Sequence, residues 1–340
     1  MKALDQKAIR RFAMENAIYI VLVLLVLGIA FQNPAFLSLN NLRNVLIQSS
    51  TRVIIALGVG GILITMGTDL SAGRQVGLAA VVSASLMQTL EYSRRFYPDL
   101  PLIPLAVPII LCLLIGIVLG FFNGVIVSKL NVPPFIATLG TMVIIYGINS
   151  IYFATEPNNS QPIGGLRPDF TTLGTGAITA MDGQISIPYI VLIALAVAIL
   201  VWILFNKTTM GKSIYAIGGN PQAAKVSGIN VTSTLIFVYS FAGALYGLAG
   251  LLEAARTGGA TNNYGNMYEL DAIAAAVVGG VSVSGGIGNV PGIVAGVLIF
   301  TVINYGLTFI GVNPYWQQIV KGLIIVFAVA FDLAKYYVKK

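Results

Sequence analysis

Residues 216–229 read AIGGNPQAAKVSGI and form the most strongly punctuated polar segment of an otherwise apolar chain. Asn220 suits a helix N-cap, because its side-chain oxygen can accept a hydrogen bond from an unpaired backbone N–H. Pro221 suits the first helical position, and Gly228 suits the left-handed residue that follows a helix end. The segment therefore predicts a very short capped helix, too short to be stable alone. We expect it to pack against another subunit.

The composition around this segment places the chain among membrane proteins. Of the 340 residues, 57% are hydrophobic and only 9% are charged, whereas soluble domains carry roughly 25% charged residues. The chain holds many apolar runs of about 20 residues, the length that crosses a bilayer. These features predict an all-α polytopic membrane protein in which residues 1–340 form a single transmembrane domain.

Ten apolar stretches are expected to cross the membrane. The first follows Lys2, Lys7, Arg10 and Arg11 and is interpreted as an uncleaved span rather than a signal peptide, because many further spans follow it. The stretches are approximately 17–32, 45–66, 75–91, 103–127, 135–153, 187–205, 233–253, 270–283, 291–310 and 317–336. The second stretch continues into a break, and the short eighth stretch is expected to be re-entrant or to cross halfway.

Basic residues predict the orientation, because they favour the cytoplasmic side of a membrane. With the N-terminus inside, 12 of the 19 Lys and Arg residues fall on inner segments and 7 on outer segments. The outer residues are Arg43, Arg52, Arg94, Arg95, Arg167, Arg256 and Lys321. Both termini and the loop 206–232 are then cytoplasmic, while residues 154–186 form the largest external loop. That loop, which contains Glu156, Asp169 and Asp182, is either a solvated connector or a docking surface for an external partner.

Two polar breaks predict a parallel internal repeat. Residues 67–73 read GTDLSAG and residues 280–286 read GVSVSGG, and the two are identical at their first, fifth and seventh positions. Each follows an apolar run and leads into another, although glycine-rich segments also match by chance. Duplicated bundles of transporters often place broken helices on the substrate path. The candidate path residues are Asp69, Ser71, Gly73, Ser284, Gly286 and Asn304.

Asp69 is the most informative of these residues because it lies between apolar runs. At bilayer depth a carboxylate needs a partner such as Arg74, or water in a cavity, and such residues often mark a substrate path. In an ordinary loop the same aspartate would simply pair with Arg74. Asn123, Asn149 and Asn304 lie within or at the ends of spans, where each either bonds a neighbouring helix or lines a polar path.

Small residues at four-residue spacing allow helices to approach closely. We interpret them as structural contacts within the subunit. The glycines with this spacing are Gly116, Gly120, Gly124, Gly243, Gly247, Gly292 and Gly296.

Motifs of enzymes are incomplete in this chain. Residues 210–213, MGKS, resemble the end of a phosphate-binding loop, but Asn206 stands where that loop needs glycine, and the segment follows a span rather than a strand. The chain has no histidine and a single cysteine, Cys112, which removes the commonest metal ligand and any disulfide within the chain. We therefore expect a non-catalytic chain that carries no cofactor or metal.

Residues 219–229 follow the pattern GNPxAAxxSGI, which resembles the cytoplasmic coupling loop of sugar-importing ABC transporter permeases of the ribose/galactose class. The DLSxG break at 69–73 resembles another signature of this family, and the likeness extends over nearly the whole chain. The chain departs from the family at residues 65–68, TMGT, and at Arg74, which replaces a small residue.

The resemblance implies the permease subunit of a binding-protein-dependent ABC importer of a monosaccharide, with galactose or methyl-galactoside expected first. Two copies would form the pore in a bacterial inner membrane, a periplasmic sugar-binding protein would dock outside, and separate ATPase subunits would carry ATP and Mg. The residues implied in ATPase coupling are Gly219, Asn220, Pro221, Ala223, Ala224, Ser227 and Gly228. The alternative is a secondary transporter driven by an ion gradient, for which Asp69 is the strongest intramembrane acid.

Overall fold

The apolar runs form helices in the computed structural model, which describes residues 17–180 and 185–337. The helices in the first half are α2 (Ala17–Gln32), the 3-10 helix η1 (Pro34–Leu37), α3 (Leu39–Ile64), α4 (Ala72–Leu86), α5 (Ala106–Lys129), α6 (Pro134–Ala154) and α7 (Pro168–Thr175). The strands β1 (Ala177–Ala180) and β2 (Ile185–Pro188) follow. The remaining helices are α8 (Tyr189–Lys207), α9 (Thr209–Gly219), α10 (Pro221–Val226), α11 (Val231–Thr257), α12 (Tyr268–Val278), α13 (Val290–Phe309) and α14 (Pro314–Tyr337).

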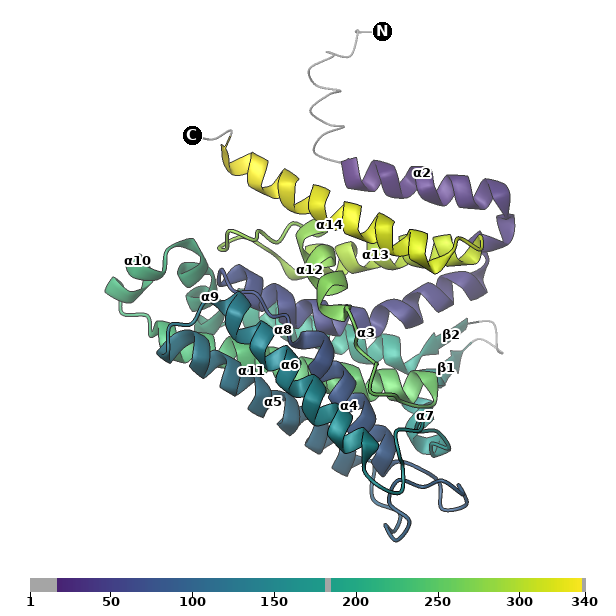
Figure 1. Cartoon of the computed structure of the whole chain (residues 1–340). Helices are drawn as coiled ribbons and strands as arrows, with labels where there is room; N and C mark the ends of the chain where they lie inside the picture. The colour runs from purple at the N-terminus through teal and green to yellow at the C-terminus, as the bar shows by residue number, and fades with distance from the viewer. Residues whose placement is uncertain (1–16, 181–184, 338–340) are drawn as a thin grey trace.

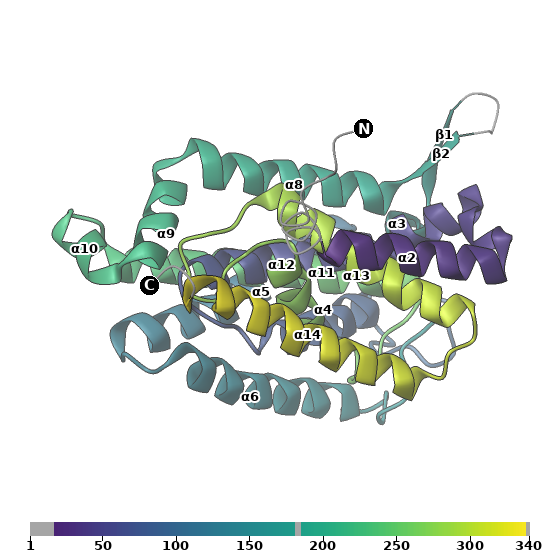
Figure 2. The same cartoon turned by 90° about the horizontal axis from the view of Figure 1, so that it is seen from above.

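The helices form layers around α3 and α11. In Figure 1, α2, α13 and α14 lie along one side, α4, α5 and α6 lie along the opposite side, and α3, α11 and α12 run between them. Figures 1 and 2 both show α9 and α10 projecting at one end of the bundle and the β1–β2 hairpin at the opposite end. We call these the α10 end and the hairpin end.

Six of the described helices are long and apolar enough to cross a membrane, namely α3, α5, α6, α8, α11 and α13. Within the apolar 18-residue stretch of α3, 83% is buried inside the protein, whereas only 28% of the corresponding stretch of α5 is buried. The apolar residues that α5 exposes have the composition expected of a surface in lipid. The protein is therefore a multi-pass helical membrane protein with α3 at its centre.

Each of the ten predicted stretches overlaps one helix of the structure. The prediction for the second stretch began too late: α3 starts at Leu39, where the Ser38 hydroxyl accepts a hydrogen bond from the Asn41 N–H. Three of these helices, α2 with 16 residues, α4 with 15 and α12 with 11, are shorter than the roughly 20 residues that span a bilayer. Ten membrane crossings therefore remain a prediction.

Glycines on α5 and α11 allow the two helix backbones to touch. A Cβ atom on Gly116 would overlap the carbonyl of Gly243, and one on Gly120 would overlap the carbonyl of Tyr239. The same holds where α13 crosses α12, because a Cβ on Gly296 would overlap the carbonyl of Ala275. The interpretation of these small residues as structural contacts is confirmed.

The loop at 154–186 carries structure of its own. It contains α7, whose Phe170 side chain is fully buried, and it leads into the antiparallel β1–β2 hairpin. A backbone bridge between Ile163 and Ala260 ties the loop to the end of α11. Within residues 17–180 and 185–337, the regular structure is thus helical apart from this one hairpin, which the sequence did not predict. Asp182 lies outside the described residues.

The structure corrects the charge comparison on which the orientation was based. Arg43 and Arg52 lie within α3, Arg256 within α11 and Lys321 within α14, so these residues are not loop charges. Several of the basic residues assigned to the inner side lie outside the described residues: Lys2, Lys7, Arg10, Arg11, Lys339 and Lys340. The orientation therefore stays a prediction.

Candidate functional site

The start of α10 is capped as its sequence predicts. Asn220 has an extended backbone, and its Oδ1 accepts hydrogen bonds from the N–H groups of Gln222 at 2.9 Å and Ala223 at 3.0 Å. Pro221 occupies the first helical position, where no intrahelical N–H bond is lost. The N-cap and proline predictions are confirmed.

The end of α10 is closed by a left-handed glycine. Gly228 has a φ of 85° and donates its N–H to the Lys225 carbonyl at 3.1 Å. The next residue, Ile229, donates to the Ala224 carbonyl at 3.0 Å. These bonds satisfy carbonyls that a helix end leaves unpaired, so a helix of six residues is fully capped at both ends.

Almost all of α10 faces outward. Ala224 is its one buried residue, at 4% exposure, whereas Val226 is 90% exposed. Because burial of a hydrophobic face normally stabilises a helix more than its caps do, α10 has little tertiary support. An exposed apolar side chain on a capped, projecting helix is a surface on which a partner can pack.

Helix α9 carries α10 and is held firmly against the bundle. A Cβ atom on Gly218 would overlap the carbonyl of Ile64, the last residue of α3, and would crowd the N–H of Gly286. That N–H donates to the same Ile64 carbonyl at 2.9 Å. We call the contact among Ile64, Gly218 and Gly286 the coupling junction, because it joins α9 to the end of α3 and to the loop between α12 and α13.

A tyrosine makes a second link from α9 to that loop. The Tyr215 hydroxyl donates to the Gly288 carbonyl at 2.9 Å, and burial raises the pKa of this hydroxyl above its usual value. Ile214 and Ile217 on the same helix are each 1% exposed. Helix α9 therefore connects α10 to the end of α3 and to the α12–α13 loop by direct contacts.

Asp69 and Ser71, two of the candidate path residues, lie in a buried polar cluster. Asp69 Oδ1 accepts hydrogen bonds from the Ser71 N–H at 2.8 Å and the Ser71 hydroxyl at 2.6 Å. The Ser71 hydroxyl also accepts from the amides of Gln75 and Asn123, each at 2.9 Å. Non-helical backbone at membrane depth must be satisfied inside the protein. In the break between α3 and α4, Asp69 accepts from the Ser71 N–H, and the Thr138 hydroxyl accepts from the Leu70 N–H at 3.1 Å.

The predicted partner of Asp69 lies elsewhere. Arg74 donates to Asn266 Oδ1 at 2.6 Å and stacks over the Tyr146 ring, with 4.4 Å between its Cζ and the ring centroid. Gly73, the third candidate of this segment, packs so closely on Glu269 that a Cβ would overlap its carboxylate. The first break is therefore tied to α5, α6 and the start of α12.

The other candidate path residues are dispersed. Gly286 belongs to the coupling junction, and Ser284 lies half-buried two residues before it, with its N–H bonded to the Ser282 hydroxyl at 3.2 Å. Asn304 lies in the second half of α13, half-buried. The structure thus joins the two sequence breaks at the coupling junction but does not gather all six candidates in one place.

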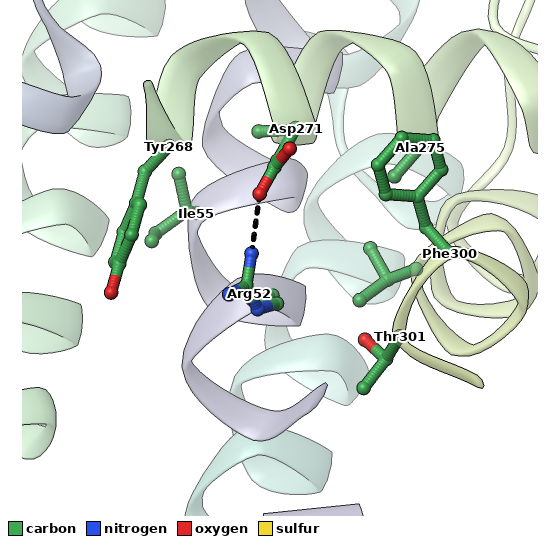
Figure 3. Close-up of a pocket in the computed structure, with 9 residues that line it drawn as sticks. Arg52, Ile55, Tyr268, Asp271, Ala275, Phe300 and Thr301 are labelled. Atoms are coloured by element: carbon green, nitrogen blue, oxygen red, sulfur yellow. Dashed lines mark hydrogen bonds and ion pairs between the residues drawn. The ribbon is translucent and has the colours of Figure 1, made fainter. Parts of the chain in front are cut away.

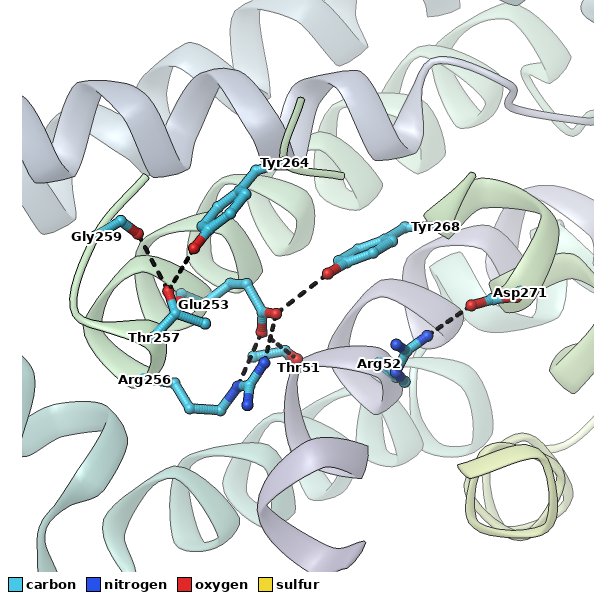
Figure 4. A network of polar contacts seen from close by, with 9 residues as sticks. All are labelled: Thr51, Arg52, Glu253, Arg256, Thr257, Gly259, Tyr264, Tyr268 and Asp271. Atoms are coloured by element: carbon cyan, nitrogen blue, oxygen red, sulfur yellow. Dashed lines mark hydrogen bonds and ion pairs between the residues drawn. The ribbon is translucent and has the colours of Figure 1, made fainter. Parts of the chain in front are cut away.

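A network of charged side chains in the half of the bundle toward the hairpin end was not predicted from the sequence (Figure 4). Glu253 on α11 is 3% exposed and accepts hydrogen bonds from Arg256 at 2.6 and 3.2 Å. It also accepts from the hydroxyls of Thr51 on α3 at 2.9 Å and Tyr268 on α12 at 3.2 Å. One carboxylate therefore connects three helices.

A second carboxylate extends this network. Asp271 on α12 accepts from Arg52 on α3 at 2.6 Å and from Lys321 on α14 at 3.1 Å. The Arg52 guanidinium also lies over the Tyr268 ring, 5.2 Å from its centroid. Figure 3 shows the small pocket beside this pair, whose volume of about 10 Å³ admits at most one water. Within residues 17–180 and 185–337, no group of His, Cys, Asp and Glu could hold a metal ion.

The sequence did contain a signal for this network. Charged residues inside apolar helices are rare and almost always paired, and Glu253 and Arg256 stand three residues apart on one helix face. Treating Arg52, Arg256 and Lys321 as loop charges concealed that signal.

The fold is that of a multi-pass helical membrane protein, and comparison with known proteins gives its family. Residues 41–329 match the family model described as branched-chain amino acid transport system / permease component. The chain belongs to this family of transport-system permeases.

The names of individual relatives also state which sugar each of them imports. The chain is 56% identical over 340 residues to the galactose/methyl galactoside import permease protein MglC of Salmonella typhimurium, and 55% identical to MglC of Escherichia coli K12, with 100% of each chain covered. It is 36% identical over 326 residues to the ribose import permease protein RbsC of Escherichia coli K12, with 96% of each chain covered. No solved structure matches the chain.

Proposed function

We propose that this chain is the permease subunit of a binding-protein-dependent ABC importer that carries galactose or methyl-galactoside across the inner membrane. The observation that carries this proposal is the 56% identity, over the full length of both chains, to a galactose/methyl galactoside import permease. The lower identity of 36% to a ribose import permease favours a hexose over a pentose.

The proposed topology has ten crossings, with both termini and the loop 206–232 in the cytoplasm and the loop 154–186 outside. In this scheme the ten crossings are the six long apolar helices together with α2, α4, α12 and α14. Because α4 and α12 are too short to cross alone, the breaks at 67–73 and 280–286 complete their crossings as two copies of a parallel repeat. Residues 1–340 then form one permease domain.

A separate ATPase subunit is proposed to hold α10 from the cytoplasm. The exposed Val226 and the capped ends of α10 give that subunit a rigid handle. ATP and Mg belong to the ATPase, and this chain contributes no cofactor. The proposed contact residues are those implied by the family resemblance: Gly219, Asn220, Pro221, Ala223, Ala224, Ser227 and Gly228.

Closure of the ATPase subunits would move α10, and α9 would pass the movement to the coupling junction. The junction lies beside both polar breaks, which carry the proposed path residues Asp69, Ser71, Gly73, Ser284 and Gly286, and Asn304 follows on α13. Two copies of the chain form the pore, and a periplasmic sugar-binding protein delivers the sugar.

Uptake into vesicles tests the proposal. The chain is reconstituted with its ATPase subunit and galactose-loaded binding protein, and we expect labelled galactose to accumulate only when ATP is supplied. Accumulation driven by a sodium or proton gradient without ATP would favour the secondary transporter instead.

Two variants of α10 test the coupling role within the same assay. Gly228→Val places a branched residue at a φ of 85°, and Pro221→Trp alters the first turn. Both variants should insert in the membrane yet abolish uptake and sugar-stimulated ATP hydrolysis. Gly140→Val on α6 is the matched control, because nothing lies within 4 Å of a Cβ there. Normal uptake by both α10 variants would refute the coupling role.

A further inference from the structure

An open hollow of about 470 Å³ lies among α3, α7 and α11 at the hairpin end. From α3 it is lined by Asn40, Arg43 and Asn44, which share one helix face because they are three and four residues apart. Thr175 at the end of α7 and Arg256 near the end of α11 complete its polar wall. Its volume falls within the roughly 300–1,000 Å³ of small-molecule sites, unlike that of the small pocket in Figure 3.

The face of α3 that carries Asn40, Arg43 and Asn44 is polar, whereas another face of the same helical turns is apolar. Leu42, on that other face, is 55% exposed, as expected of a residue in contact with lipid or a neighbouring chain. Ionisable residues within membrane helices, such as Arg43, face the bundle interior or a water-filled cavity and often mark substrate paths. The hollow therefore has the composition of a polar route and not of an accidental gap.

Two side chains of the hollow already donate within the protein: the Asn44 amide to the Tyr305 hydroxyl at 3.3 Å, and the Thr175 hydroxyl to the Thr171 carbonyl at 2.9 Å. Their side-chain oxygens remain available as acceptors. The Arg256 guanidinium is neutralised by Glu253, at 2.6 Å. Among the described residues, the buried Nε of Arg43 has no hydrogen-bond partner. Asn40 is exposed. Amide, hydroxyl and guanidinium groups supply both donors and acceptors to a ligand rich in hydroxyl groups.

The inner wall of the hollow leads to the charged network. Arg256 lines the hollow, its partner Glu253 accepts from Thr51, and Glu253 also accepts from Tyr268 on α12. Thr51 lies seven residues after Asn44 and continues the same face of α3. A ligand in the hollow would thus touch the network that joins α3, α11 and α12.

We propose that this hollow is the entry site for an uncharged monosaccharide, which Asn40, Arg43, Asn44 and Thr175 hold by hydrogen bonds to its hydroxyl groups. The Arg256–Glu253 pair forms the inner wall of the site. The inference rests on the proposed import of a sugar and adds the place where the sugar first meets this chain. The competing occupant is a side chain of the external binding protein.

Filling the hollow is the first test. Asn40→Trp places an indole in it, whereas Leu42→Trp places the same group on another face of the same helix turn. Both are assayed in the complete assembly with ATP and loaded binding protein. We expect Asn40→Trp to lower galactose uptake about tenfold or more and Leu42→Trp to leave it unchanged. Equal uptake by the two variants would overturn the entry site.

Chemical labelling gives a second measurement that does not depend on transport. The one cysteine of the chain, Cys112, is fully buried, so the background reaction with a membrane-impermeant maleimide is low. Asn40→Cys and Thr175→Cys are labelled with and without millimolar galactose, and Gln161→Cys, exposed in the loop after α6, is the control. We expect galactose to slow labelling at positions 40 and 175 but not at 161.

The outcomes separate the entry site from the proposed function. Absence of ATP-dependent uptake by the unaltered assembly refutes the proposed function, whatever the labelling shows. With uptake intact, labelling at positions 40 and 175 that galactose leaves unchanged overturns the entry site alone. Protection by the binding protein without sugar, and none by free galactose, would assign the hollow to protein docking and also overturn the inference.

Discussion

At the α10 end, a helix of six residues projects with one buried side chain, whereas toward the hairpin end charged groups from α3, α11, α12 and α14 are bound to one another inside the bundle. The first region is stabilised by local contacts, mainly the Asn220 cap and the closing Gly228. The second is stabilised by contacts between helices that are far apart in the sequence. The two ends of one bundle are therefore built to respond differently to force.

Energetics explain the difference. A helix cap contributes about 1 kcal/mol, so a partner can grip or displace α10 without breaking the fold. A buried carboxylate that loses its partner costs about 3–5 kcal/mol, so helices joined by Glu253 and Asp271 resist separation. We infer that movement enters at the α10 end and that the charged network keeps the other half of the bundle together.

Removing the charge of Asp271 should have the largest effect on stability. Asp271→Asn leaves the positive charges of Arg52 and Lys321 near each other without the negative charge that they share. Because these two side chains are 29% and 28% exposed, we expect a loss of about 3 kcal/mol, the lower end of the range for a broken buried pair. Thermal unfolding of the purified protein in detergent measures it.

The control for Asp271 is an exposed ion pair. Asp169, with a side chain 46% exposed, pairs with Arg167 near the start of α7, and Asp169→Asn should change stability by about 1 kcal/mol or less. Equal losses in the two variants would show that the network does not fix the helices as we describe.

A bulky residue at the coupling junction should have an intermediate effect on stability and a large effect on transport. Gly218→Val forces a side chain against the backbone of Ile64 and Gly286, which cannot yield as a side chain would. We expect about 1–3 kcal/mol of destabilisation from overpacking. Uptake should fall about tenfold or more, because α9 no longer seats on α3. Uptake and stability are measured on the same preparation, with Gly140→Val on α6 as the control, since nothing lies within 4 Å of a Cβ there.

Changing the exposed face of α10 should have the smallest effect on stability. Val226→Gln alters a side chain that is 90% exposed, so the free energy of unfolding should change by about 0.5 kcal/mol or less. Binding of the ATPase subunit, measured by titration in detergent, should nevertheless weaken severalfold. Undiminished binding would remove Val226 from the proposed contact and leave only the caps of α10 as its recognition feature.

The sequence predicted some features of both regions and missed others. The caps of α10 were predictable because Asn220, Pro221 and Gly228 act within a few residues of the chain. The breaks after α3 and α12 were also predictable from glycine and polar residues between apolar runs. The carboxylates that hold the network together were missed, because Asp271 and its partners lie on three separate helices.

By itself, the sequence determined the class of protein, the positions of its helices and the capped segment at 220–228, because apolar length and local hydrogen bonds decide these features. Only the tertiary structure decided that Gly218 touches Ile64 and Gly286, that Asp69 is buried with Ser71 instead of paired with Arg74, and that Asn40 faces Arg256 across a hollow. These contacts depend on how helices cross, and a helix crossing is fixed by the packing of residues distant in the chain.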